Sequence, residues 1–141
     1  MAKQSTSIRI RPDLKDELEQ RAREAGVSTA SLYERFIEEG LRRDAHPLIA
    51  FADGAGGRRA VLVGSRLTVG QVVETIEAAR GKDEARLREA AAYLGIPLSH
   101  VRACVRYYAQ YRDDVDEWRR RTADAADREH ESWQREQALF S

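Results

Sequence analysis

The chain has 141 residues, of which 42% are hydrophobic, enough for one ordinary domain or for two very small domains that are marginal alone. Its 24 basic and 24 acidic residues balance, which excludes a global positive field and leaves only local basic surfaces for nucleic acid. A single cysteine, no apolar run long enough to cross a bilayer and no signal-peptide region predict a cytoplasmic protein without disulfides or membrane contact.

The first element is S-I-R-I-R, residues 7–11, where polar and apolar side chains alternate with the period of a β-strand. Pro12 ends the run, and no partner strand follows nearby. A lone strand leaves its N–H and C=O groups unpaired, so the partner must come from elsewhere. The simplest supplier is a second copy of the chain, paired antiparallel about a two-fold axis.

Two amphipathic helices follow this strand. The first is expected to be capped by Asp13 and to end at Gly26, and the second to be capped by Ser28 and to end by residue 43. In the homodimer, the apolar faces of strand and helices would form one intertwined core. The residues expected in that core are Ile8, Ile10, Leu14, Leu18, Leu32 and Phe36.

D-A-H-P, residues 44–47, predicts a boundary, and a second unit follows it. Apolar runs at 48–52 and 59–63 flank a glycine-rich turn, which predicts a β-hairpin. Three helices are expected next: 69–80 with a Thr68–Gln71 capping box, one from a cap at Asp83 to Gly95, and one from a cap at Ser99 to about Asp113. The fold is therefore expected to be mainly α, with domains at 1–43 and 46–118 and a charged tail at 119–141.

The segment E-A-A-A-Y-L-G-I-P-L-S-H-V-R-A-C-V has the spacing of a helix-turn-helix, with Gly95 at the turn. Read in that way, its second helix exposes Ser99, His100, Arg102 and Arg106 as a second DNA-contacting surface. The alternative is simple helix packing with the arginines solvated.

Neither a metal site nor an active site is predicted. His46, His100 and His130 are scattered, without metal-ligand spacing. Cys104 has no His or acid at a telling distance, so we expect a small core residue and not a nucleophile. Of Tyr107 and Tyr108, one ring is expected in the core and one at its edge. No nucleophile, base and orienting group can be identified, so we expect no enzyme and no cofactor.

From residue 119 onward the chain is charged and alanine-rich, with little apolar surface to dock on its own domain. Such a segment often becomes ordered only on a partner, with large side chains as anchors. Trp133, Leu139 and Phe140 are the candidate anchors. The alternatives are a solvated helical tail, or one that packs across the homodimer.

Residues 5–43, with the sequence S-I-R-I-R-P-D-L-K-D-E-L in their strand and first helix, resemble the ribbon-helix-helix repressors, in the branch typical of antitoxins. The resemblance implies that the paired strands lie in the DNA major groove, where Ser7, Arg9 and Arg11 read base edges. It also implies that backbone N–H groups at Ser28 and Thr29 contact a phosphate, with Lys3 as a further backbone contact. The alternative is that Arg9 and Arg11 only form the solvated face of a dimerising ribbon.

A second resemblance covers R-A-V-L-V-G-S-R-L-T-V-G-Q-V-V-E-T-I and the segment from Leu98 to Trp118. These segments are similar to a small bacterial domain that accompanies PIN-domain toxin genes and is regarded as a VapB-like antitoxin module. Its recurrent marks are matched by Gly64–Arg66 and by the tyrosine pair. The resemblance implies that the C-terminal tail wraps the toxin and that Arg128 or Arg135 reaches the acidic, Mg²⁺-binding ribonuclease site.

Together these features predict a type II antitoxin that binds operator DNA as a homodimer, or as a higher oligomer on DNA, to repress its own operon. Its C-terminal part would neutralise a PIN-domain ribonuclease toxin. One rival is a stand-alone repressor whose middle domain senses a ligand or contacts DNA. Another is a structural interaction protein whose ribbon only dimerises.

Overall fold

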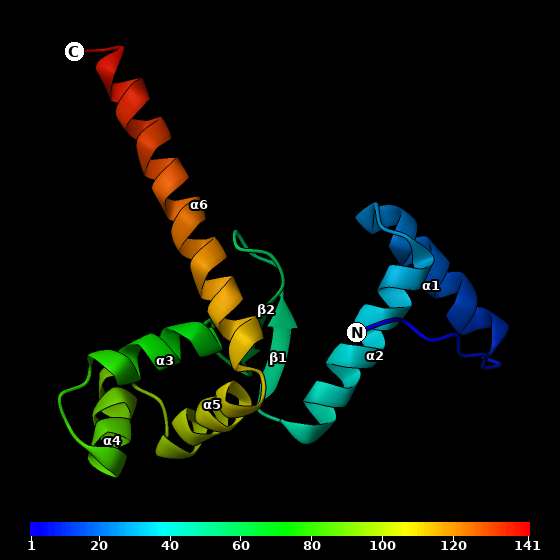
Figure 1. The fold of residues 1–141 in the computed structure, drawn as a ribbon, viewed down its shortest axis with the longest axis horizontal. Coiled ribbons are helices and arrows are strands. Elements are labelled where there is room, and N and C mark those ends of the chain that lie inside the picture. The colour runs from blue at the N-terminus through cyan, green and yellow to red at the C-terminus, as the bar shows by residue number, and fades with distance from the viewer. The chain divides into compact units, whose positions relative to one another are not determined.

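The structure is a computed structural model that describes all residues, 1–141, and contains six helices and one two-stranded sheet (Figure 1). The mainly helical architecture with a small hairpin is as predicted. The chain divides into unit 1, residues 1–41, and unit 2, residues 42–141. This division falls inside a helix, shortly before the D-A-H-P segment.

Unit 1 contains α1 (Pro12–Ala25) and most of α2 (Thr29–Ala45). Pro12 occupies the first turn of α1, where its missing N–H costs nothing, and Arg11 is the N-cap. The prediction that Asp13 caps this helix was therefore wrong: Asp13 is the second helical residue. Gly26 ends α1 with φ +68°, as predicted, because glycine adopts the left-handed conformation without penalty.

Ser28 caps α2 as predicted, since its Oγ accepts a hydrogen bond of 3.1 Å from the Ser31 backbone N–H. The helix then runs to Ala45, slightly beyond the predicted end. Upstream of α1, residues 1–11 have no regular secondary structure in the single chain. The strand expected at 7–11 is not formed, because one chain offers no neighbour for its backbone groups, and its pairing with a second chain stays a prediction.

Unit 1 has almost no core of its own. Ala22 and Leu32 are its only buried residues, and α1 and α2 make little contact with each other. Several large apolar side chains of this unit are exposed instead: Ile8, Ile10, Leu14, Val27, Phe36, Ile37 and Leu41.

Unit 2 begins with the predicted hairpin, formed by β1 (Ile49–Ala52) and β2 (Arg59–Leu62). The strands are antiparallel, with Ile49 opposite Leu62 and Ala52 opposite Arg59. The connecting loop is closed by two hydrogen bonds between Gly54 and Gly57, of 3.1 Å and 2.9 Å, and Gly57 has φ +97°. The glycine-rich segment therefore supplies the tight turn that the sequence predicted.

The remaining elements of unit 2 are α3 (Val69–Ala78), α4 (Asp83–Leu94), α5 (Leu98–Gln110) and α6 (Arg112–Ala138). Thr68 and Gln71 form the predicted capping box at the start of α3. The caps predicted at Asp83 and Ser99 were wrong, because Lys82 and Pro97 are the N-cap residues. Pro97 is already extended, with φ −60° and ψ 147°, so α5 starts one residue before Ser99.

One continuous hydrophobic core holds unit 2 together. It lies between the hairpin, α3, α5 and the first turns of α6, with Ala91 added from α4. Its fully buried residues include Ile49, Leu62, Val69, Val72, Val101, Cys104 and Tyr107.

The helix α6 starts directly after Tyr111, so the last predicted helix of the middle domain ends at Gln110 and not near Asp113. Its first turns pack on α3, α5 and β2, and its C-terminal half extends away from the rest of unit 2 (Figure 1). Thr122 still contacts the hairpin loop at Gly56. The folded unit thus continues a few residues into the segment predicted as a tail.

Candidate nucleic-acid interface and partner-binding helix

The N-terminal residues that the ribbon-helix-helix resemblance assigns to base reading are all exposed. Arg9 makes no ion pair, so its guanidinium is available for a ligand. The Nε of Arg11 lies 3.5 Å from a carboxylate oxygen of Asp13. Lys3 donates a hydrogen bond of 2.9 Å to Glu34, so its expected DNA contact would compete with a surface ion pair, which is a weak interaction.

The start of α2 is held by local hydrogen bonds between Ser28 and Ser31. The Ser28 hydroxyl oxygen accepts a hydrogen bond from the Ser31 backbone N–H, and the Ser28 carbonyl accepts one of 2.9 Å from the Ser31 hydroxyl. The first backbone N–H groups of a helix have no partner within the helix, and they carry the positive end of its dipole. At this position the backbone of Ser28 and Thr29, and not the Ser28 hydroxyl, is the group that remains for a phosphate.

The predicted dimer-core residues separate into two groups. Leu32 is buried within unit 1 and Leu18 is half-buried, so these two already pack inside the single chain. The others are solvent-exposed, from 36% for Ile10 and 37% for Phe36 to 65% for Ile8: Ile8, Ile10, Leu14 and Phe36.

In unit 2, α4 and α5 are joined by Gly95, which has φ +67°, and by Ile96 and Pro97. Of the surface proposed for a second DNA contact, Ser99, Arg102 and Arg106 are exposed and His100 is half-buried. Arg102 is paired with Glu84 of α4, so only Arg106 presents an unpaired charge on this surface.

The two adjacent tyrosines of α5 occupy different environments, as predicted. Tyr107 is buried, and burial raises the pKa of its phenol, with the hydrogen bond from Arg42 acting in the opposite direction. Tyr108 is half-buried and donates a hydrogen bond of 2.9 Å to Asp116.

Arg42 forms a cluster that the sequence did not predict. It donates to the Tyr107 hydroxyl at 3.0 Å and to Asp114 at 2.6 Å, and its guanidinium carbon lies 4.0 Å from the Tyr111 ring centre. His46 packs edge-on against Tyr107, with ring centres 5.3 Å apart. These contacts tie the end of α2 to α5 and α6 within unit 2.

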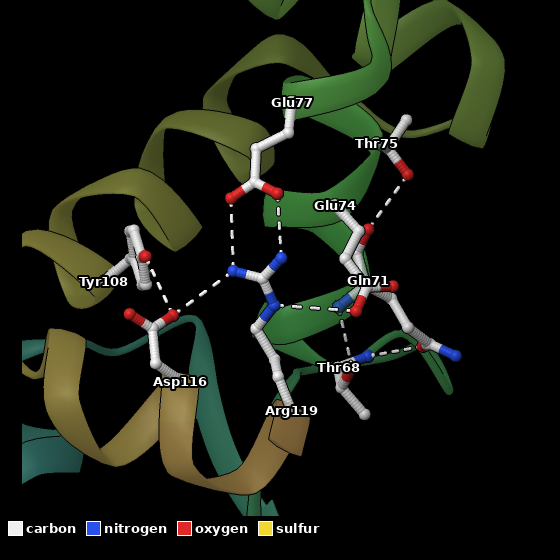
Figure 2. A network of polar contacts seen from close by, with 8 residues as sticks. All are labelled: Thr68, Gln71, Glu74, Thr75, Glu77, Tyr108, Asp116 and Arg119. Atoms are coloured by element: carbon white, nitrogen blue, oxygen red, sulfur yellow. Dashed lines mark hydrogen bonds and ion pairs between the residues drawn. The ribbon is translucent and has the colours of Figure 1, made fainter. Parts of the chain in front are cut away.

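A second polar network joins α6 to α3 (Figure 2). Arg119 makes two hydrogen bonds to Glu77, of 3.1 Å and 2.8 Å, and one of 3.2 Å to Asp116. Its Nε lies 3.5 Å from Glu74. These carboxylates, Glu77 first, raise the pKa of the Arg119 guanidinium above its already high value. Arg119 therefore serves the folded unit, although it is the first residue of the predicted tail.

The five residues predicted to bind a toxin lie on or just after the projecting part of α6. Trp133, Leu139 and Phe140 are 54%, 80% and 86% exposed, and the Trp133 ring stacks on His130. Arg128 and Arg135 are exposed and make no ion pair. The structure thus presents these residues on a preformed helix, without contact to the core of unit 2.

The single cysteine lies in the core of unit 2. Cys104 is fully buried, and burial raises the pKa of its thiol to about 11, which suppresses the thiolate. No group of three or more His, Cys, Asp or Glu side chains is placed to hold a metal ion. None of the helices combines the length and apolar character needed to span a membrane.

Comparison of the chain with protein-family models, with curated proteins and with solved structures gave no match.

Proposed function

We propose that this protein is a homodimeric DNA-binding antitoxin, which represses its own operon through a paired N-terminal ribbon and neutralises a PIN-domain ribonuclease through α6. The observation that carries the proposal is the incomplete core of unit 1 together with its alternating N-terminal segment. Its helices barely contact each other, and only Ala22 and Leu32 are buried.

A second copy of the chain would supply what unit 1 lacks. Burying a large apolar side chain fully stabilises a fold by about 1.5 to 3 kcal/mol. Ile8, Ile10, Leu14 and Phe36 are between 36% and 65% exposed, so each would add part of this amount on association. Pairing of residues 7–11 with the same residues of the second chain would also satisfy their backbone groups.

The dimer would concentrate positive charge in one place. Ser7, Arg9 and Arg11 alternate with the isoleucines, so a paired strand would direct all three away from the core. Two chains would place four arginines on one narrow ribbon, which has the width to enter a major groove. The unpaired guanidinium of Arg9 supports its role as the principal base reader.

The projecting part of α6 supports the second half of the proposal. Exposed aromatic side chains on a projecting helical segment are typical anchors for a partner, because they fill pockets on the partner's surface. Arg128 and Arg135 are free to pair with the carboxylates of a ribonuclease site.

The experiment is a gel shift of the full chain with the DNA upstream of its own gene, at several salt concentrations. We expect specific binding that weakens steeply with salt, because the protein releases counterions from the phosphates it neutralises. Arg9→Ala should abolish specific binding while the chain stays dimeric. Unchanged operator affinity of that variant would refute the assignment of Arg9.

A second candidate is a stand-alone regulator in which unit 2 makes its own DNA contact. The observation that favours it is the pair α4 and α5 with its left-handed Gly95 turn and the exposed Arg106. Arg106→Ala would then weaken DNA binding, whereas the antitoxin proposal predicts no change in this variant.

A further inference from the structure

A groove runs between α3 and α4 on the surface of unit 2, with a volume of about 610 Å³. Its deepest residues are the buried alanines Ala79 and Ala90, and Ala78 continues this small-residue surface outward. Because alanine side chains are short, the backbones of both helices are accessible at the bottom of the groove. A side chain of another molecule can therefore lie along both helices. We call this feature the α3–α4 groove.

The walls of the α3–α4 groove are apolar. Leu67 and Leu94 are half-buried there, and Tyr93 stands beside them with 82% of its surface exposed. Tyr93 is an aromatic ring on a folded surface that packs against no other ring. An aromatic face of this kind binds apolar groups and, through its quadrupole, cations.

The charged residues that line the groove are both acidic, and Gln71 and Thr75 are its neutral polar residues. Glu74 and Glu89 line it, and no lysine, arginine or histidine does. Glu89 is held in place because its Oε2 accepts hydrogen bonds of 3.0 Å and 3.1 Å from the backbone N–H groups of Arg80 and Gly81. Its Oε1 is not used by these bonds.

Nearby bases neutralise this negative charge only in part. Figure 2 shows Glu74 beside Arg119, but that guanidinium also pairs with Glu77, so these two carboxylates share one positive charge. Arg86 donates to the Ala79 carbonyl at 3.3 Å and does not line the groove.

We propose that the α3–α4 groove is a docking site for a partner-protein segment that presents an arginine or lysine side chain among apolar residues. The aliphatic stem of such a side chain would lie on the alanine floor beside Tyr93, and its charged end would reach Glu74 and Glu89. The C-terminal segment of a second copy does not fit this chemistry. Residues 123–141 carry five acidic and two basic side chains, a formal charge of −3.

The test uses the full chain and two twelve-residue peptides that alternate leucine with arginine or leucine with glutamate. Binding is followed by NMR through the methyl signals of Ala78 and Ala90 and the ring signals of Tyr93. We expect saturable shifts of these signals with the arginine peptide only. Absence of saturation at about 1 mM peptide, or equal binding of the glutamate peptide, would overturn the proposal.

Two matched variants locate the binding. Ala78→Arg places a positive charge in the groove and should weaken binding of the arginine peptide at least tenfold. Ala92→Arg adds the same charge at an exposed α4 position that does not line the groove and should change the affinity less than twofold. Equal effects of both variants would show a non-specific attraction and overturn the site.

Tyr93→Ala provides a variant whose fold is not at risk, because this side chain is almost fully exposed. It should weaken the arginine peptide several-fold without changing the thermal unfolding temperature, and unchanged affinity would count against the groove. Free arginine amide serves as the competitor. If it displaced the peptide at equal concentration, the groove would bind a small cation and not a protein segment.

Discussion

Arg119 of α6 donates hydrogen bonds of 3.1 Å and 2.8 Å to Glu77 of α3 from both of its terminal nitrogens. The two residues are 42 positions apart in the chain, and their pairing fixes the first turns of α6 against α3. The Arg119 side chain is 21% exposed and that of Glu77 is 55% exposed, so the pair is partly shielded from solvent. The segment beyond Thr122 thus continues from the first turns of α6, which pack on the core of unit 2.

Arg119→Ala should therefore destabilise unit 2 by about 1 to 2 kcal/mol, because two charge-assisted hydrogen bonds to Glu77 are lost and the surrounding carboxylates repel each other. Arg120→Ala is the control: Arg120 is exposed, pairs only with Glu117 in its own helix, and should change stability by less than about 0.5 kcal/mol. Urea unfolding followed by circular dichroism measures both. Equal effects would show that the Arg119 pair contributes nothing particular.

Gly70 of α3 lies directly against the Trp118 ring of α6, so a Cβ at Gly70 would approach that ring to 2.6 Å. Gly70→Ala should cost about 1 to 3 kcal/mol, since the crowded helix pair must move apart. The cost should shrink in a Trp118→Phe background, where the smaller ring leaves room. Thermal unfolding of the two single variants and the double variant measures this coupling, and strictly additive effects would contradict the contact.

We expect the free energy of unfolding to fall at high pH because of Cys104. Burial raises the pKa of its thiol from 9.0 to about 11, so the folded state favours the protonated form. This contribution is complete below pH 9 and is lost as the pH rises through 11, with a slope of up to about 1.4 kcal/mol per pH unit.

Cys104→Ala isolates the effect, although its small cavity costs about 1 kcal/mol at every pH. The stability difference between the wild type and this variant, measured by urea unfolding at pH 8 and pH 10, should narrow at the higher pH. A difference that does not change with pH would contradict the account.

Local patterns in the sequence predicted many of the helix and strand boundaries in both units. The Thr68–Gln71 capping box and the glycines at 26 and 95 were correct because each depends on residues within one turn of a helix. The caps predicted at Asp13, Asp83 and Ser99 were wrong, and for Asp13 and Ser99 a neighbouring proline gives the reason. Pro12 and Pro97 already set the backbone angles at which their helices begin.

The contacts of α6 could not be predicted because they are long-range. The charged composition from residue 119 indicates a separate tail. In the structure, however, Arg119 pairs with Glu77, and Thr122 contacts Gly56 in the hairpin loop. The Arg42 cluster also depends on long-range contacts, since Tyr107 and Asp114 are 65 and 72 residues away from Arg42 in the sequence. Helix periodicity contains no information about such partners. The strand at 7–11, by contrast, was expected to need a second chain from the start.

Deletion of residues 123–141 should leave unit 2 intact, because these residues follow Thr122, which contacts the hairpin loop, and most of them belong to the projecting part of α6. We expect an unfolding free energy within about 0.5 kcal/mol of that of the full chain, since only solvated helix is removed. A co-expressed PIN-domain toxin should no longer be bound or neutralised. Trp133→Ala in the full chain should weaken that binding at least tenfold, with Ser141→Ala as the control.

A toxin that still co-purifies with the deleted chain would show that the inhibitory surface lies elsewhere. If the deleted chain bound the toxin more weakly but still neutralised it, Arg128 and Arg135 would have no essential role in the ribonuclease site.

The most direct test of the central claim, that a second chain completes unit 1, is the solution mass of the full protein by light scattering. The account predicts twice the 16.0 kDa of one chain, and it predicts that Phe36→Glu dissociates this dimer and abolishes operator binding, because a charge would enter the shared core. A wild-type mass of one chain, or a Phe36→Glu variant that stays dimeric and binds operator DNA, would contradict the account.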